Sequence, residues 1–326
     1  MKKFFYFAFA AVVALANVAC GDDDDDNGGN NGKKPVTITE APMSDNAFMA
    51  TLDEGTPVMG EKDDTQLPQR VKAVSVLDGG QLSVTVEELD ENGDVVETNV
   101  IVTDVEEVEK TDNGTKFKVN SDKFKGFVEV MDEVATSRGQ MSEGQININF
   151  TINGVTYSTN GTPVQCLMQA ALASNGGVLT YVCQKFLVKS MIIECKGDVK
   201  VYKTVNGGNL LEVYNIANDK GANLTDEDKK GFNKVVKYVS VSRFGELNIV
   251  YADNTCDGGN WDWVKGQTDE MTLWLKDKGM GNKFIPENPK IDLEFSGNTC
   301  SMTIHATITG SKNYEASLTL IMDAQK

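Results

Sequence analysis

Apolar and polar residues alternate with a period of two over most of residues 36–160. Lys72 to Leu77 and Gln81 to Leu89 follow this period on either side of the turn residues Asp78-Gly79-Gly80. Successive side chains of a strand point to opposite faces, so the pattern predicts half-buried strands. Asn-Gly turns such as Asn153-Gly154 are typical of tight hairpins. The sequence therefore predicts an antiparallel β-meander in this region.

The spacing of the apolar residues changes after Thr162-Pro163, which is a helix start signal. Apolar residues then recur at helical spacing as far as Leu172. The segment Val178 to Ile193 also fits a helix, with a strand as the alternative, because valine, isoleucine and aromatic residues abound there. Residues 161–198 are therefore expected to form a helical connection.

Two stretches of sequence occur twice in the same order. Val71 to Val86 shares a valine, a lysine, VSV, a glycine and a leucine in register with Val236 to Tyr251. Ile148 to Gly154 is matched by Ile304 to Gly310, each followed closely by a tyrosine. This order predicts two related β units, near 71–160 and 236–323. Convergent hairpin composition is the alternative.

The resulting expectation is a mainly β (α+β) fold, with two antiparallel β-meander or barrel-like units joined by a helical connection. The meander order of the C-terminal unit is similar in pattern to small lipocalin-like barrels. The expected boundaries are a signal peptide at 1–19, an acidic tether at 20–35, an N-terminal β domain at 36–160, the connection at 161–198 and a C-terminal β domain at 199–326.

The first residues have the layout of a secretory leader. Lys2 and Lys3 precede an apolar run that is too short to span a bilayer stably, and small residues follow. Cys20 then heads a run of five aspartates and a polar stretch that cannot form a packed core. Lipid attachment at Cys20 explains this arrangement. Cleavage after Ala16 into a secreted protein is the alternative.

A cysteine followed at once by an acidic run resembles the surface-exposed lipoproteins of Bacteroidetes. The resemblance covers about the first 35 residues and concerns the cellular location of the protein rather than its activity. It implies a chain anchored through lipid to the outer membrane and exposed on the cell surface.

The formal net charge of -17 at pH 7 limits the classes of partner. Such a surface repels phosphate backbones and anionic lipid headgroups. Nucleic acid is therefore not expected as a partner, and membrane attachment is expected only through the lipid anchor.

Few residues offer catalytic or metal-binding chemistry. His305 is the one histidine, so a zinc site built on two histidines is excluded. The motifs G-x-S-x-G, H-E-x-x-H and the Walker loop do not occur. No catalytic residue, cofactor or metal is therefore expected.

Cysteine number suggests one disulfide. Five cysteines stay after Cys20 is lipidated, so they cannot all pair within the molecule. Cys256 and Cys300 each follow Asn-Thr, and they are the expected pair. Buried thiols are expected at Cys166 and Cys183.

The candidate ligand site follows the second repeated hairpin. Trp261 and Trp263 are spaced to project on one face of an extended segment, beside the polar residues Asp257, Asn260 and Asp262. Flat aromatic rings with polar neighbours suit a sugar-stacking platform. A purely structural role for the tryptophans in the core is the alternative.

The function expected from the sequence is non-catalytic binding of an extracellular ligand, either a glycan or an apolar small molecule. A surface polysaccharide hydrolase with a carboxylate pair is a second hypothesis, because the spacing of such a pair is set by the fold. A structural or adhesin-like surface protein is a third.

Overall fold

The computed structural model describes residues 46–53, 58–61, 67–131, 142–172, 179–196, 201–219, 226, 229, 232–264, 270–275, 290–309 and 313–325. The expected signal peptide, the tether and Cys20 lie outside these residues. None of the helices in the described ranges is long and apolar enough to cross a membrane.

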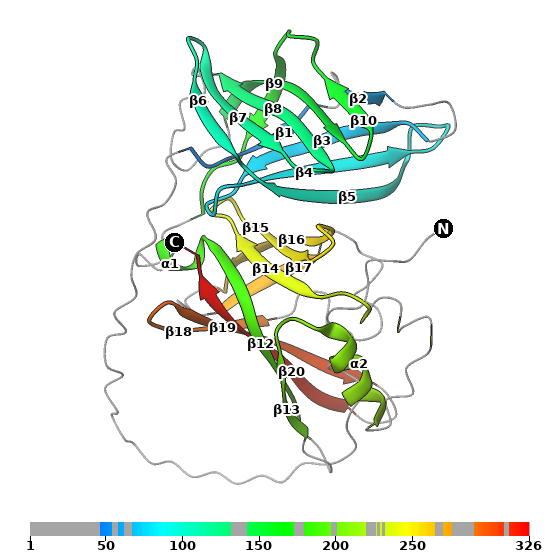
Figure 1. The fold of residues 1–326 in the computed structure, drawn as a ribbon, viewed down its shortest axis with the longest axis vertical. Coiled ribbons are helices and arrows are strands. Elements are labelled where there is room, and N and C mark those ends of the chain that lie inside the picture. The colour runs from blue at the N-terminus through cyan, green and yellow to red at the C-terminus, as the bar shows by residue number, and fades with distance from the viewer. Residues whose placement is uncertain are drawn as a thin grey trace.

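The first unit is an antiparallel sheet that wraps around its own core (Figure 1). Its pairing runs from β10 through β2, β3, β1, β11, β9, β8 and β7 to β6, with β4 and β5 continuing from β3. Its strands are β1 (Phe48–Leu52), β2 (Val58–Glu61), β3 (Gln69–Val76), β4 (Gln81–Leu89), β5 (Val95–Asp104), β6 (Glu107–Lys110), β7 (Gly114–Asn120), β8 (Phe124–Met131), β9 (Ser142–Ile152), β10 (Val155–Ser158) and β11 (Val164–Met168).

The second unit lies below the first in Figure 1. Strands β14 to β20 pair in chain order, and β12 pairs with both β14 and β20, so the described pairing returns to its start in a barrel-like ring. Its elements are α1 (Leu179–Val182), β12 (Lys185–Lys196), β13 (Val201–Asn206), α2 (Leu210–Asp219), β14 (Val236–Val241), β15 (Glu246–Tyr251), β16 (Cys256–Trp263), β17 (Glu270–Leu275), β18 (Lys290–Ser296), β19 (Thr299–Thr309) and β20 (Asn313–Ala324).

The fold class expected from the sequence is confirmed as mainly β with two antiparallel units, but the helical connection is wrong. Residues 164–168 form β11 in the first sheet and residues 185–196 form β12 in the second. Pairing with β20 shifts register between Val188 and Ser190. This irregularity changes which face later side chains occupy, so the buried residues Phe186 and Met191 do not follow a period of two.

The two repeated hairpins share a local irregularity. The β3–β4 pair shifts register between Val71 and Ala73, and the β14–β15 pair shifts between Val236 and Tyr238. These positions correspond in the sequence match of the two stretches. Both copies therefore bend at the same place, as expected of two units built on one plan.

The turns of the two hairpins are also alike. Gly80 and Gly245 have φ angles of 77° and 81°, in the region that favours glycine. The amide of Gly80 donates to the carbonyl of Leu77 at 2.9 Å, and that of Gly245 donates to Ser242 at 3.1 Å. Each glycine is required by the left-handed backbone of its turn.

Both hairpins are buried on their two faces. In β4, residues from Gln81 to Val86 are all buried, and β15 is buried throughout. One face of each hairpin packs into the core of its own unit. The other face meets the opposite unit, where a small apolar cluster joins Leu77 and Val102 of the first unit to Tyr238, Val250 and Cys256 of the second.

Candidate functional site

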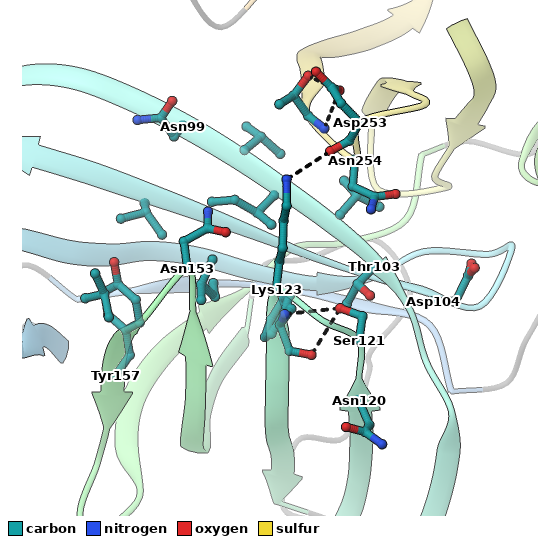
Figure 2. Close-up of a pocket in the computed structure, with 18 of the residues that line it drawn as sticks. Asn99, Thr103, Asp104, Asn120, Ser121, Lys123, Asn153, Tyr157, Asp253 and Asn254 are labelled. Carbon is teal, nitrogen blue, oxygen red and sulfur yellow. Dashed lines mark hydrogen bonds between the residues drawn. The ribbon is translucent and has the colours of Figure 1, made fainter. Parts of the chain in front are cut away.

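The two units meet around a cavity of about 670 Å³, which we call the interunit cavity. Its lining comes from β5, from the turns that join β7 to β8 and β9 to β10, and from the second unit on both sides of β15 (Figure 2). Small-molecule sites in proteins commonly have volumes of about 300–1,000 Å³. The cavity is therefore large enough for a ligand of that size.

Strand β5 forms one wall of the interunit cavity. All residues from Asn99 to Asp104 line it. Asn99 and Ile101 pair with Val86 and Val84 of the first core, so their side chains lie on the inner face of the first unit. Side chains alternate between faces along a strand, so a run of consecutive lining residues places the edge of β5 along the cavity.

The opposite wall consists of hairpin turns. Ser121 Oγ accepts a hydrogen bond from the amide of Phe124 at 3.1 Å, which fixes the turn before β8. Asn153 begins the next turn with a φ of 49°, a conformation that asparagine tolerates better than most residues. Lys123 extends from the first turn across the cavity, and its Nζ donates to the carbonyl of Asp253 at 3.4 Å (Figure 2).

The second unit closes one side of the interunit cavity with Lys237, Tyr238 and the β15–β16 turn. Asp253 Oδ1 accepts hydrogen bonds from the amide and hydroxyl of Thr255, at 3.0 and 2.7 Å. Asn254 lies between them with a φ of 65°. Thr255 also forms an antiparallel bridge with Ile101 of β5. The turn is therefore fixed against the first unit.

A carboxylate at the cavity end near β4, that of Asp104, is held ionised by its neighbours. Lys185 Nζ donates to Asp104 Oδ1 at 2.7 Å, and Gln81 Nε2 donates to the same oxygen at 3.2 Å. Burial alone would raise the pKa of Asp104, but these hydrogen bonds and the nearby lysine charges lower it below its ordinary value. At the other end of the cavity, burial raises the pKa of Tyr157 to about 12.

A buried polar network fixes the relative position of the two units. Glu246 of β15 is 1% exposed, and its carboxylate accepts hydrogen bonds from Ser75 at 2.5 Å and from Ser83 at 2.7 Å. In the reverse direction, Ser240 donates to Gln81 at 3.0 Å. Ser75 and Gln81 match Ser240 and Glu246 in the repeat, so the two contacts are exchanged copies of one another, as at a two-fold interface.

An ion pair joins two residues that occupy the same position in the two repeated hairpins. Asp78 corresponds to Arg243 in the repeat, and its carboxylate accepts hydrogen bonds from the amide of Arg243 at 2.8 Å and from its Nε at 2.7 Å. Burial raises the pKa of Asp78, although the hydrogen bonds and charge of Arg243 oppose this rise. The pair joins the tips of the two hairpins.

The tryptophans expected to form a platform do not line the interunit cavity. Trp261 is 2% exposed in the core of the second unit, and its Nε1 donates to the carbonyl of Ser242 at 3.0 Å. Trp263 is half-buried, with its ring centroid 5.1 Å from that of Trp261. Trp261 is therefore a core residue and does not belong to an exposed sugar-stacking surface of the kind that the sequence had predicted. The reason is that side chains alternate along β16 and this face points inward.

The polar residues expected beside the tryptophans are not gathered into one site. Asn260 and Asp262 are exposed and alternate with the tryptophans along β16. The carboxylate of Asp257 accepts a hydrogen bond from the hydroxyl of Tyr251. These three residues therefore do not surround the rings as a platform would require.

The disulfide expected between Cys256 and Cys300 is also corrected, because both residues are thiols in the structure. Cys256 belongs to the apolar cluster between the units, and its Sγ donates to the carbonyl of Val100 at 3.0 Å. Cys300 belongs to the core of the second unit. Cys166 and Cys183 are buried thiols, as expected.

Alkylation of these thiols is expected to be coupled to unfolding. Burial raises the pKa of Cys166 to about 11 and that of Cys300 to about 12, and it also raises the pKa of Cys183. The thiolate is the reactive species, so at pH 8 iodoacetamide should modify all three far more slowly in the folded protein than in guanidinium chloride. Stability from these raised pKa values is complete below the ordinary thiol pKa and is lost as pH rises through the folded values.

Site-resolved mass spectrometry measures the alkylation rates. Thr98→Cys provides an exposed thiol as control, and it should react at similar rates with and without denaturant. Equal rates at Cys300 in both conditions would contradict its burial.

The single histidine lies away from the interunit cavity. His305 is exposed on β19, and its Nε2 is 2.6 Å from Asp292 Oδ2. Within the described ranges, no group of three or more His, Cys, Asp or Glu side chains could hold a metal ion.

Sequence reasoning did not identify Asn99, Lys123, Asn153 or Tyr157 as cavity residues. They lie on different strands and turns, and their types are ordinary for a strand or turn. The Asn-Gly signal at 153–154 located a turn without indicating what the turn faces.

No family model matches the chain, and no curated protein matches it. Among solved structures, a crystal structure of a Nitrosomonas europaea protein described as ATTH aligns with 84% of this chain and 90% of its own, at 7% identity and a TM-score of 0.20.

Proposed function

We propose that the protein is a non-catalytic binding protein that holds an extracellular ligand in the interunit cavity. The observation that carries the proposal is the cavity itself, lined by two units that a buried polar network keeps in place. Binding sites occur preferentially at interfaces between structural units, where concave surfaces form without disturbing either core.

The lining favours a ligand with both apolar and polar groups. The aliphatic side chains of Val100, Ile101 and Val155 provide apolar surface. Amides surround them, at Asn99, Asn120, Asn153 and Asn254, and these can both donate and accept hydrogen bonds. A few polar groups around apolar walls are typical of sites that orient a ligand.

The charges favour a neutral or cationic ligand over an anionic one. Lysine contributes two side chains to the lining, Lys123 and Lys237, whereas the carboxylates come from Glu88, Asp104, Glu106 and Asp253. The net charge of -17 adds a repulsive field for anions.

The hydrolase hypothesis has no comparable support. A glycoside hydrolase commonly needs a carboxylic acid with a raised pKa to protonate the leaving group. Among the described carboxyl groups with a resolved pKa shift, that of Asp78 has a raised pKa. Asp78 is paired with Arg243 and does not line the interunit cavity. The pKa of Asp104, which does line the cavity, is lowered instead.

A cavity-filling variant tests the proposed site with the neutral dye N-phenyl-1-naphthylamine as the probe. Asn99→Trp should place an indole in the cavity and weaken binding of the dye about tenfold or more, which corresponds to about 1.4 kcal/mol. Fluorescence titration measures the affinity.

Thr98→Trp is the matched control for the dye experiment. Thr98 is the exposed neighbour of Asn99 on β5 and does not line the cavity, so this variant should bind like the wild type. Equal affinity of the Asn99→Trp protein and the wild type would remove the interunit cavity as the site.

The proposal includes attachment to the outer surface of the cell through lipidated Cys20. It rests on the leader and the acidic tether of the first 35 residues. Mass spectrometry of the mature N-terminus should find a diacylated cysteine at position 20. An unmodified chain that starts at Asn17 would instead indicate a secreted protein.

A further inference from the structure

The free edge of β5 suggests the chemical class of the ligand. Among the described strands, β5 forms a ladder with β4 alone, apart from one bridge between Ile101 and Thr255, and β6 pairs with β7 alone. In the second unit, the corresponding strand β16 pairs with β15 on one edge and β17 on the other. The first unit thus has an open edge where the second unit continues its sheet.

The interunit cavity runs along this edge. Its lining includes the run from Asn99 to Asp104, which is about 17 Å of extended chain. Before this run, β5 continues outward with Val95 and Val96, which are 46% and 44% exposed. An edge strand with exposed apolar side chains is a template for pairing with another extended chain.

The backbone orientation of β5 is given by its contact with the second unit. The carbonyl of Val100 accepts a hydrogen bond from Cys256 Sγ at 3.0 Å, so it points away from β4. In an antiparallel strand, the amide and carbonyl of one residue lie on the same side and alternate along the chain. The amide and carbonyl of Thr98 therefore also point to the free edge.

The second unit already uses this edge in the way an added strand would. Thr255 bridges antiparallel to Ile101. Apart from that single bridge, the part of β5 before Asn99 pairs with β4 on one edge and has no described strand partner on the other edge. An extended chain can therefore lie along Val95 to Asn99 and place its end in the cavity.

We propose that the ligand is an extended, neutral or basic peptide segment that adds to the free edge of β5, with its end in the interunit cavity. This inference rests on the proposed binding function and names its ligand class. The amides of Asn99 and Asn153 can each pair with a peptide group, because a side-chain amide and a peptide group offer the same donor and acceptor. The cavity carboxylates favour lysine or arginine in the segment.

The experiment begins with selection of phage-displayed dodecapeptides on the immobilised full chain, followed by calorimetric titration of the selected peptides. Each peptide is then N-methylated at one backbone position at a time. Strand addition predicts that methylation weakens binding at least tenfold at every second residue and has little effect at the residues between, since only alternate amides face β5. Equal sensitivity at adjacent residues would overturn the inference.

Variants of β5 provide the matched test on the protein. Thr98→Pro removes the amide at the free edge, where proline is compatible with an edge strand, and should weaken peptide binding at least tenfold. Thr98→Val keeps the amide and should bind like the wild type. Equal binding by both variants would contradict pairing at this edge.

The two proposals fail in different ways. If Asn99→Trp weakens dye binding but no peptide is selected, or selected peptides bind equally well to Asn99→Trp, the peptide inference is wrong and the binding function stands. If Asn99→Trp leaves the dye affinity unchanged, the cavity is not the site and both proposals fail.

Discussion

Glu246→Ala is expected to lower the free energy of unfolding by about 3 kcal/mol or more. The carboxylate of Glu246 is 1% exposed and accepts hydrogen bonds from Ser83 at 2.7 Å and from Asn248 Nδ2 at 2.9 Å, as well as from Ser75. Its removal leaves these donors buried at the junction of the two units without that acceptor. Guanidinium chloride unfolding, followed by far-ultraviolet circular dichroism, measures the loss.

Two further variants separate the network from general effects of substitution. Glu246→Gln keeps an acceptor oxygen and nearly the same shape, so its loss should be smaller than that of Glu246→Ala. Glu294→Ala removes an exposed carboxylate from β18 and should change stability by less than about 0.5 kcal/mol. A similar loss for Glu246→Ala and Glu294→Ala would show that the buried network does not hold the units together.

Trp261→Ala is expected to lower the free energy of unfolding by about 3–5 kcal/mol, the range measured for large aromatic residues removed from cores. The indole lies among the buried side chains of the second unit and hydrogen-bonds the carbonyl of Ser242. Alanine would leave a cavity and remove the donor to that carbonyl. Thermal and denaturant unfolding of the variant measure the change.

Asp262→Ala is the neighbouring control, because Asp262 is exposed on β16. It should leave stability within about 0.5 kcal/mol of the wild type. Trp261→Phe keeps much of the apolar volume and should lose less than Trp261→Ala. If Trp261→Ala were as stable as the wild type and instead abolished binding of an extracellular glycan, the surface-platform interpretation would replace the core position.

The sequence was most informative where local chemistry decides the structure. Asn153-Gly154 and Gly80 occupy turns because they tolerate positive φ angles, and Ile148 alternates with polar neighbours because β9 is buried on one face. These signals depend on a few adjacent residues. They located the hairpins without knowledge of the partner strands.

The main error in the fold came from reading side-chain period across an irregular strand. In β12 the register shift between Val188 and Ser190 breaks the alternation, and the remaining spacing of apolar residues is compatible with a helix. Periodicity assumes a uniform backbone, so one bulge is enough to change the interpretation of the whole segment.

The sequence by itself determined the β class, the positions of the hairpins and the correspondence between two stretches of the chain. It did so because turns and alternation are local properties. The tertiary structure alone decided that the matched hairpins face one another, with Ser75 on Glu246 and Ser240 on Gln81. It also decided that Trp261 is core and that a cavity lies beside β5, because burial and concavity depend on residues far apart in the chain.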